Sequence, residues 1–394
     1  MIGRRRTQPD RDLAITFLAH TAAASGAELA TVRLATALLA RGVTSNVMFT
    51  QDGPMVAELE RRQIPVRVVT GDFDSSSVKI GGSRLALLAG VWQMIRLGWE
   101  VGAVTRASGS TVIVAESTKA LLMGAIASRR ARIPLIWHVH DRISAEYFGT
   151  VMAVVLRVLG RVVSAGYIAN SRSTLQSLVT FGTRAIVAYP GVEQLNVAKH
   201  TQRSAEDVRV VMIGRLERWK GQDLLLRALA QSRHTPATTF VGGAHFGEDF
   251  GDELVALAAE LGITDTVTFA GHVSDPTPFL TDADIAVHCS RTTEPFGQVI
   301  VEAMAAGCAV IAAAAGGPLE IVTDGVDGLL VDPTDTAELA AALDRLIDDQ
   351  SLRTELSDRG RSTAATFTID ETAEVVEEFL SGRSVGSACG LSHA

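Results

Sequence analysis

The sequence predicts an α/β protein made of two doubly wound, parallel-sheet domains. Short apolar runs of strand length alternate with longer helical patterns over most of the 394 residues. This alternation is typical of a parallel sheet that carries helices on both faces. A polar stretch at Glu193–Asp207 interrupts the alternation, which restarts beyond it. That interruption, in a chain long enough for two or three domains of about 150 residues each, indicates two domains.

Each half of the chain supplies its own set of strands. In the first half they are expected at Leu13–Ala19, Ser45–Phe49, Val66–Val69, Thr111–Ala115, Leu135–His138, Tyr167–Ala169 and Ile186–Ala188. In the second half they are expected at Val208–Gly214, Thr239–Val241, Val267–Phe269, Ile285–His288, Ala309–Ala313 and Gly328–Val331. Helical patterns lie between them, for example Glu28–Arg41, Gly221–Ser232, Gln298–Ala306 and Thr336–Asp349.

The expected domains follow from these elements. Residues 1–190 form an N-terminal Rossmann-like domain, 191–207 a linker and 208–365 a C-terminal Rossmann-like domain. A helix within 366–381 is expected to pack back toward the N-terminal domain, and the Gly- and Ser-containing tail 382–394 to be disordered. Two facing domains of this kind leave a cleft, and ligands bind beyond the carboxyl ends of the strands.

The composition excludes two classes of protein. Lys and Arg number 36 against 44 Asp and Glu, and a net charge of −8 argues against a nucleic-acid binder driven by phosphate neutralisation. A hydrophobic fraction of 47% argues against a disordered chain. Cys289, Cys308 and Cys389 have no metal-binding spacing, and so few cysteines fit a reducing compartment. We therefore expect a cytoplasmic protein.

Two apolar stretches are interpreted as parts of the globular fold. Leu13–Ala24 follows Arg4–Arg6 as in a secretory signal, but Asp12 and His20 favour a buried first strand that ends in a glycine turn. The stretch 151–168 is the most apolar of the chain, and two arginines within it exclude a membrane span.

Three polar features follow strands of the first half or open the second. Gly26 lies at the turn after the first strand, where a helix N-terminus can face an anion. His138 and His140 end another strand, and a substrate-contacting histidine is favoured there over a metal site or a structural role. The loop 214–221 carries Arg215 and Lys220, which suit a diphosphate; a solvated basic loop is the alternative.

Two further features come late in the chain. Glu294 precedes an apolar helix that carries Glu302, and a carboxylate among apolar residues needs a partner such as a ribose hydroxyl. Gly316 and Gly317 form another turn into a helix N-terminus that suits phosphate.

These residues belong to longer motifs that resemble the retaining glycosyltransferases of family 4, which have the GT-B fold. The matching segments are GRLERWKGQDLLLRAL (214–229), FVGGA (240–244), FAGHV (269–273) and TEPFGQVIVEAMAAGCAVIAAAAGGPLEIVTDGVDGLLV (293–331). Weaker matches are SGAE (25–28), HVHD (138–141), IANSRST (168–174) and YPGVE (189–193). Glu294 and Glu302 reproduce the EX7E motif of that family.

The resemblance implies roles in the second half of the chain. Arg215 and Lys220 would hold the diphosphate of a nucleotide-sugar donor, and Glu294 would contact hydroxyls of the transferred sugar. Phe296 and Gly297 would offer backbone amides.

The resemblance also implies a contact with the donor ribose and contacts between residues of the first half of the chain and the donor. Glu302 would bind the donor ribose. Gly26 would let the first domain approach the phosphates, although Ser25 stands where the family has a second glycine. His140 would orient the sugar, with His138 as its competitor.

The resulting hypothesis is retaining transfer of a sugar from a nucleoside diphosphate to an alcohol acceptor, without a cofactor or a metal. Cations at the diphosphate stabilise the leaving charge without a metal. The metal-type pair Asp72/Asp74 lies in a polar turn, and Asp282/Asp284 lies at the entry end of a strand, away from the expected cleft; we interpret both as chance. The alternatives are a GT-B-like nucleotide-sugar epimerase and a non-catalytic nucleotide-sugar-binding subunit.

The acceptor is expected to be a glycan, a polysaccharide or a lipid-linked intermediate of the cell envelope. The stretch 83–99 carries Trp92, Arg96 and Trp99 around an apolar body. It fits a helix that lies peripherally on the inner face of a membrane, or equally a core-facing helix with basic ends.

Overall fold

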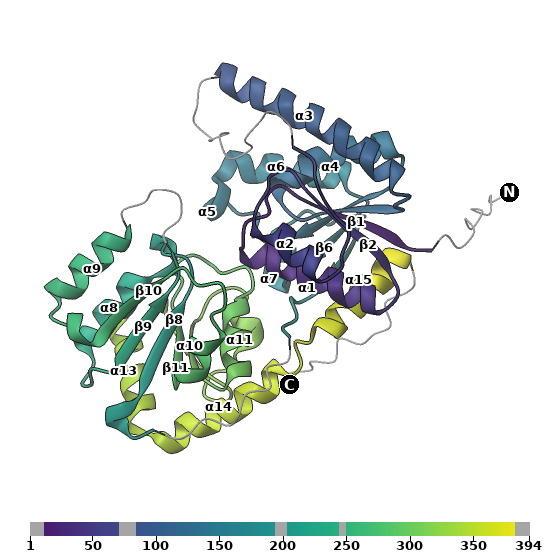
Figure 1. Cartoon of the computed structure of the whole chain (residues 1–394). Coiled ribbons are helices and arrows are strands. Elements are labelled where there is room, and N and C mark those ends of the chain that lie inside the picture. Colours follow the sequence, from purple (N-terminus) through teal and green to yellow (C-terminus); the bar gives the residue numbers. More distant parts are fainter. Residues whose placement is uncertain (1–11, 71–83, 194–202, 244–249, 383–394) are drawn as a thin grey trace. The chain divides into compact units, whose positions relative to one another are not determined.

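We describe a computed structural model of the chain, which covers residues 12–70, 84–193, 203–243 and 250–382. The described residues fall into two compact units, each built on its own parallel sheet (Figure 1). Unit 1 comprises residues up to 170, 174–191 and the chain from Ile369, whereas unit 2 comprises 171–173 and 192–368. The predicted fold class, α/β with two doubly wound parallel sheets, is confirmed.

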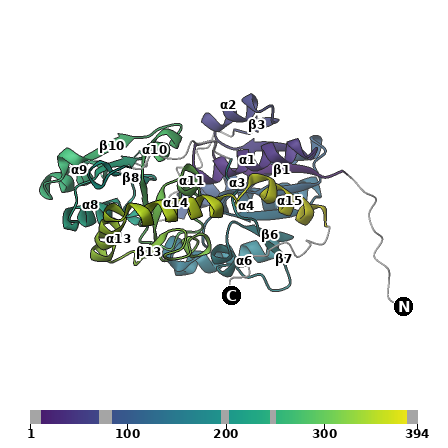
Figure 2. The ribbon, with the colours of Figure 1, turned by 90° about the horizontal axis from the view of Figure 1, so that it is seen from below.

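The sheet of unit 1 has the order β3-β2-β1-β4-β5-β6-β7, and every pair is parallel. Figure 2 shows this order from β3 at one edge through β1 and β6 to β7. The strands are β1 Ala14–Ala19, β2 Thr44–Phe49, β3 Val66–Val68, β4 Val112–Ala115, β5 Leu135–Val139, β6 Gly166–Ala169 and β7 Arg184–Val187. The helices are α1 Gly26–Ala40, α2 Pro54–Arg61, α3 Arg84–Ala107, α4 Thr118–Ala131, α5 Ala145–Phe148, α6 Thr150–Val163, α7 Arg172–Gln176 and α15 Ile369–Ser381.

Strand periodicity divides the core of unit 1 between the two faces of its sheet. On β1, Phe17 packs with residues of α1, α2 and α15, whereas Leu18 packs with residues of α3, α4 and α6. Successive side chains of a strand point to opposite faces, so a buried strand needs apolar residues at both sets of positions. The continuous apolar run that resembled a secretory signal is thus explained over β1 by burial on both faces.

Unit 2 repeats the architecture with the sheet order β10-β9-β8-β11-β12-β13. The strands are β8 Arg209–Ile213, β9 Ala237–Val241, β10 Val267–Gly271, β11 Ile285–His288, β12 Ala309–Ala313 and β13 Leu329–Val331. The helices are α8 Gln222–Gln231, α9 Phe250–Glu260, α10 Thr277–Asp282, α11 Gln298–Ala306, α12 Pro318–Ile321, α13 Thr336–Asp348 and α14 Gln350–Ala364. Among the described residues, no helix has the length and apolar character to span a bilayer.

The end of the chain returns to unit 1 through α15, which lies beside α1 in Figure 1. Phe379 is buried, and a Cβ on Gly166 would come within 2.8 Å of its ring. The guanidinium of Arg184 lies 4.7 Å from the centre of the same ring, and Arg41 pairs with Glu377 at 2.8 Å. Aromatic burial and two cation contacts therefore join residues far apart in the sequence.

We predict that Phe379→Ala lowers the free energy of unfolding of unit 1 by about 3–5 kcal/mol, because truncating a buried phenylalanine removes apolar burial and leaves a cavity. Denaturant unfolding followed by circular dichroism measures the change, and Glu374→Ala on the exposed side of α15 is the matched control. A loss below about 1 kcal/mol would show that α15 contributes little to unit 1.

Candidate functional site

Three neighbouring strands bring the predicted second-half residues to one edge of the unit 2 sheet. Strands β8, β11 and β12 are adjacent and parallel, so their carboxyl ends share that edge. The loop after β8 carries Arg215 and Lys220, the loop after β11 carries Glu294, and the loop after β12 carries Gly316 and Gly317. The topology therefore gathers loops that are separated by between about 20 and 100 residues in sequence.

Lys220 and Glu294 form the centre of this group. The Lys220 Nζ donates to both carboxylate oxygens of Glu294, each at 3.0 Å, and both side chains are largely buried. Ser290 Oγ donates to Glu294 Oε2 at 2.8 Å, and His288 Nε2 lies 3.3 Å from the same oxygen. Four polar side chains thus converge on one point at the sheet edge.

The positive charge of Lys220 and the negative charge of Glu294 stabilise each other. Burial alone would raise the pKa of Glu294, but the positive charge of Lys220 and the contacts from His288 lower it well below its usual value. Glu294 is therefore an anion that fixes the position of Lys220. The ammonium also lies 4.1 Å from the centre of the Trp219 ring, a cation–π contact that holds it from another side.

Arg215 occupies a more exposed position in the same loop. Its Nη1 pairs with Glu217 at 2.9 Å, and its carbonyl accepts a hydrogen bond from the Gln222 side chain at 2.7 Å. Arg218 points elsewhere and pairs with Glu253 of α9. Two cations of the loop, Arg215 and Lys220, are therefore held by carboxylates of unit 2 close to the sheet edge.

The glycines of the β12 loop allow two loops to pack tightly together. Gly316 has φ +73°, and a Cβ there would lie 2.4 Å from the Glu294 carbonyl oxygen. A Cβ on Gly317 would lie 2.3 Å from Phe296 Cα, and its N–H donates to the Glu294 carbonyl at 2.9 Å. These close approaches require glycine. The helix that follows, α12, has four residues and begins directly after Gly317; a phosphate contact at this turn stays a prediction.

Phe296, Gly297 and Glu302 have different surroundings. Phe296 is buried and packs on Phe367 at 5.8 Å, so its side chain anchors the loop. Gly297, with φ +103°, precedes the first residue of α11. Glu302 is half-buried on that helix and accepts a hydrogen bond from Gln298 Nε2 at 3.1 Å. The expected cost of burying Glu302 is thus smaller than its apolar neighbours suggested.

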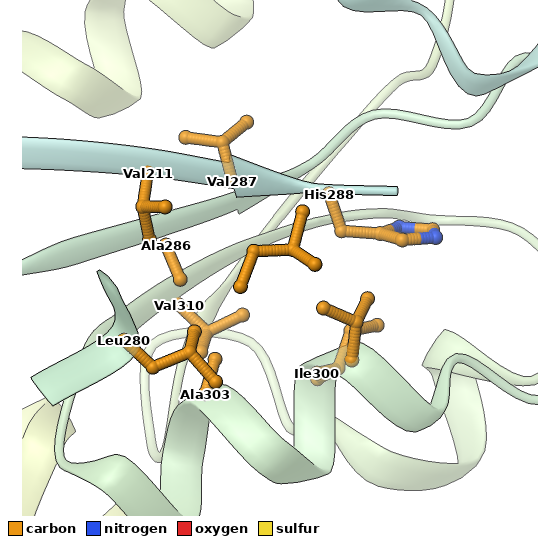
Figure 3. Close-up of a pocket in the computed structure, with 10 residues that line it drawn as sticks. Val211, Leu280, Ala286, Val287, His288, Ile300, Ala303 and Val310 are labelled. Carbon is orange, nitrogen blue, oxygen red and sulfur yellow. The ribbon is translucent and has the colours of Figure 1, made fainter. Parts of the chain in front are cut away.

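An apolar pocket lies between the sheet and α11, next to this group (Figure 3). The labelled side chains that line it are aliphatic except for His288. Its lining offers almost no hydrogen-bond partners, so the pocket does not suit a sugar or a phosphate.

In unit 1, the predicted histidines lie at the end of β5 beside a carboxylate that ends β4. His140 Nε2 lies 2.7 Å from Glu116 Oε2, which also accepts from Thr31 Oγ1 at 3.0 Å. His138 Nδ1 lies 3.0 Å from the same oxygen but without hydrogen-bond geometry. The two imidazoles are 4.1 Å apart. The histidine with a directed partner is therefore His140.

Burial and charge separate the two histidines. Burial lowers the pKa of His138. It also opposes the charged form of His140, but the hydrogen bond and the charge of Glu116 raise the pKa of His140 above its usual value. Burial would raise the pKa of Glu116, yet the two histidines lower it to about 2. Glu116 and His140 thus form an ion pair in the acidic range.

This cluster also presents three potential metal-ligating atoms within 4.8 Å of one another. The nitrogen-to-oxygen distances of 2.7 and 3.0 Å are shorter than the roughly 3.3 Å that separates two ligands on a tetrahedral zinc. The contact of His140 with Glu116 fits hydrogen bonding and ion pairing better than metal ligation. The absence of a metal requirement stays a prediction.

The last residues singled out in the sequence are Gly26 and the two acidic pairs. Gly26 is exposed at the start of α1, where Ser25 donates to the buried Glu28. Asp282 and Asp284 lie at the amino end of β11 and pair with Arg203 and Arg209, as expected for residues outside the site. Asp72 and Asp74 lie outside the described residues.

Sequence reasoning missed three members of these groups. Glu116 and His288 stand at the ends of predicted strands, and Ser290 follows two residues later. The same strand-end rule that selected His140 would have found Glu116 and His288. No local motif indicated that either touches a predicted site residue.

We predict that Glu116→Gln destabilises unit 1 most between about pH 4.5 and 6.5. Because the pKa of Glu116 is lowered from 4.5 to about 2, its carboxylate stabilises the fold fully above pH 4.5, and this stabilisation is lost as the pH falls toward 2. Because the pKa of His140 is raised above 6.5, its imidazolium stabilises the fold fully below pH 6.5, and this stabilisation is lost as the pH rises through the raised pKa. Glu28, His138 and Asp141 are the other groups that face this pair.

Thermal unfolding from pH 3 to 9 measures this effect. We expect a decrease of about 5–10 °C in Tm for Glu116→Gln near pH 5.5, corresponding to about 2–3 kcal/mol, and a smaller decrease at both ends of the range. The exposed Glu100→Gln is the control in the same unit. A difference that does not vary with pH would contradict the ion pair.

Comparisons with known proteins agree with this architecture. Residues 195–363 match the family described as glycosyl transferases group 1, and residues 25–189 match a glycosyl transferase 4-like domain. The crystal structure of Anabaena Alr3699/HepE in complex with UDP-glucose is 31% identical, with a TM-score of 0.80, and the match covers 94% of this chain and 100% of that one.

Curated relatives include D-inositol 3-phosphate glycosyltransferases. That of Thermomonospora curvata is 28% identical over 92% of this chain and 91% of its own length. That of Salinispora arenicola is 40% identical over 172 residues, which are 41% of this chain. The chain covers only 38% of the length of the Salinispora protein.

Proposed function

Because the chain belongs to the GT-B glycosyltransferases of the GT4 type, we propose that it transfers a sugar from a nucleoside-diphosphate sugar to an alcohol acceptor with retention of configuration. The observation that carries the proposal is the Lys220–Glu294 pair at the carboxyl edge of the unit 2 sheet. A fixed ammonium beside a fixed carboxylate can bind both parts of such a donor, the anionic diphosphate and the hydroxylated sugar.

The leaving group is stabilised by cations in this proposal. Breaking the bond between the sugar and the phosphate leaves negative charge on the nucleoside diphosphate and oxocarbenium character on the sugar. Lys220 and Arg215 neutralise the former, and the Glu294 carboxylate accepts hydrogen bonds from sugar hydroxyls. Lys220 donates to both carboxylate oxygens of Glu294, and these two hydrogen bonds orient its ammonium.

The remaining site residues of unit 2 contact other parts of the donor in this proposal. Glu302 accepts hydrogen bonds from the ribose, since its carboxylate, which accepts from Gln298 Nε2, is only half-buried. The backbone amides of Phe296 and Gly297 face the donor. The roles of Gly26, His138 and His140 toward the donor stay predictions from the resemblance.

We propose that no metal takes part in the transfer. Arg203 pairs with both Asp282 and Asp284, and Arg209 also pairs with Asp282, which supports this view. The UDP-glucose named for the Anabaena protein supports a UDP-sugar as the first donor to test. The acceptor is proposed to be a glycan, a polysaccharide or a lipid-linked intermediate.

The test begins with a thermal-shift screen of nucleotide sugars, because a ligand that binds only the native state raises Tm. The best donor is then incubated with candidate acceptors, and proton NMR of the product reports the anomeric configuration. Retained configuration with release of the nucleoside diphosphate supports the proposal. Inverted configuration contradicts retention, and a sugar isomerised on its nucleotide without release indicates an epimerase.

We predict that Lys220→Ala lowers kcat/KM for the donor about 10²–10³-fold, because one preorganised charge toward the leaving group is lost. The matched control is Arg218→Ala, which removes a cation of the same loop that pairs with Glu253 instead. Steady-state kinetics with EDTA present measure both variants, and Tm values verify folding. Near wild-type activity of Lys220→Ala would contradict the diphosphate assignment.

A further inference from the structure

The two carboxylate oxygens of Glu294 have different numbers of hydrogen-bond partners. Oε2 lies 3.0 Å from Lys220 Nζ, 2.8 Å from Ser290 Oγ and 3.3 Å from His288 Nε2. Among the residues that the structure describes, Oε1 has Lys220 as its single partner, at 3.0 Å. Each oxygen of a carboxylate has two lone pairs, so the protein fully occupies Oε2, whereas Oε1 can accept one more hydrogen bond.

Strand geometry brings His288 and Ser290 to the same place. His288 is the last residue of β11, and Ser290 follows two residues later. Residues two apart in a strand point to the same face, and the distance of 3.1 Å between Ser290 Oγ and His288 Nε2 shows that this direction is kept beyond the strand. Figure 3 shows the His288 ring at the end of the strand, beyond the aliphatic side chains of the pocket.

The neighbours of the His288 ring determine the direction of these hydrogen bonds. Both acceptor groups, the Ser290 hydroxyl and the Glu294 carboxylate, lie at Nε2. The other nitrogen, Nδ1, is buried and has no hydrogen-bond partner within the described parts of the chain. A proton is therefore carried by Nε2, where it meets acceptors. His288 donates to Ser290 and Glu294, and the Ser290 hydroxyl donates its own proton to Glu294.

His288 and Ser290 are too buried to contact a ligand themselves. They are 5% and 1% exposed, whereas the side chains of Glu294 and Lys220 keep 12% and 16% of their exposure. The backbone of Glu294 is held separately, because its carbonyl accepts a hydrogen bond from the Gly317 N–H at 2.9 Å. His288 and Ser290 can thus act on a ligand only through the orientation of the Glu294 carboxylate.

We propose that His288 and Ser290 are positioning residues, which hold Glu294 so that Oε1 accepts a hydrogen bond from one hydroxyl of the transferred sugar. The inference rests on the proposed function, because it concerns the sugar of a nucleotide-sugar donor. One oxygen with one remaining lone pair selects one hydroxyl in one direction. Such a site discriminates against a donor that lacks this hydroxyl, since the acceptor then loses its partner.

The sugar end and the diphosphate end of the donor can be tested separately. An ammonium has three N–H donors, and the two contacts of Lys220 with Glu294 use at most two of them. The contacts from His288 and Ser290 do not involve Lys220. Removing these contacts should therefore weaken the binding of the sugar and leave the binding of the diphosphate unchanged.

Calorimetric titration of the full chain with UDP and with UDP-glucose tests the proposal. We expect His288→Leu with Ser290→Ala to weaken UDP-glucose binding about tenfold, because the carboxylate is no longer held toward the sugar. UDP binding should change less than about twofold. The leucine suits the apolar pocket beside His288. His288→Gln, which keeps a side-chain N–H, should bind UDP-glucose like the wild type.

The matched control is Ser232→Ala with His234→Leu in the same unit. Ser232 Oγ donates to Asp344 at 2.6 Å, and His234 Nε2 lies 2.7 Å from Asp348. The same two types of side chain are thus removed from carboxylates outside the site. This variant should bind both UDP and UDP-glucose like the wild type. Circular dichroism and Tm values verify the folding of every variant.

A second measurement uses analogues of UDP-glucose that each lack one hydroxyl of the glucose. We expect one analogue to bind the wild type at least about tenfold more weakly than UDP-glucose, because Glu294 Oε1 then has no hydroxyl to accept from. The His288/Ser290 variant should lose most of this discrimination.

Two results would overturn the proposal while the donor site stands. The His288/Ser290 variant could bind UDP-glucose as well as the wild type, or it could weaken UDP and UDP-glucose equally, as expected for a purely structural role. The wild type could also bind every analogue as well as UDP-glucose, which would contradict the selection of one hydroxyl. A wild type that binds neither UDP nor UDP-glucose would instead contradict the proposed donor, and this inference with it.

Discussion

Parallel strands carry their carboxyl ends to the same edge of a sheet, and the polar cluster of each unit depends on this constraint. In unit 2 the adjacent strands β8, β11 and β12 deliver Lys220, Glu294 and Gly316 to one edge. In unit 1 the adjacent strands β4 and β5 deliver Glu116 and the two histidines. Residues distant in sequence meet because the strands that precede them are neighbours.

Electrostatics then decides what the gathered residues can do. A buried carboxylate is costly unless a cation and hydrogen bonds compensate it, and Glu294 has Lys220, Ser290 and His288 for this purpose. The compensation holds the ammonium in one place on a rigid sheet edge. Such preorganisation is what a transition state that expels a diphosphate requires, since the charge need not be moved into position during the reaction.

Gly316 and Gly317 also constrain the position of Glu294, by close packing of the backbone. The close approach of Gly316 and Gly317 to Glu294 and Phe296 joins the loop after β12 to the loop after β11. Phe296 in turn is fixed by its contact with Phe367. The position of the Glu294 backbone is thus determined by packing, and its side chain by charge.

The sequence predicts much of this because both signals are local. Alternating apolar runs predicted the two sheets, and the loops after the strands identified Lys220 and Glu294. Contacts between loops carry no local signal, so Ser290 and the partnership of Glu116 with His140 required the structure. The sequence predicts a phosphate contact at Gly316, and the structure adds a close backbone contact with Glu294. A glycine turn before a helix is compatible with both, so the sequence alone does not reveal the backbone contact.

Exposure was the other quantity that the sequence left open. The apolar stretch 151–168 was predicted not to span a membrane, and no described helix does so. Periodicity alone could not tell which valines of α6 face the sheet, since both sides of the helix are apolar. For α3, the sequence allowed either a helix that lies on a membrane or a core-facing helix. Leu97 and Val101 of α3 are buried in the core of unit 1, whereas Trp92 and Trp99 are exposed.

The central claim is that the Lys220–Glu294 pair forms part of a donor site in unit 2, with Lys220 at the diphosphate of the donor. Calorimetric titration of the full chain with UDP, without acceptor or added metal, tests it most directly. The account predicts that Lys220→Ala weakens UDP binding about 10–100-fold, the effect of losing a charged hydrogen bond, while Arg218→Ala changes it less than about twofold. Equal UDP affinity of the wild type and Lys220→Ala would contradict it.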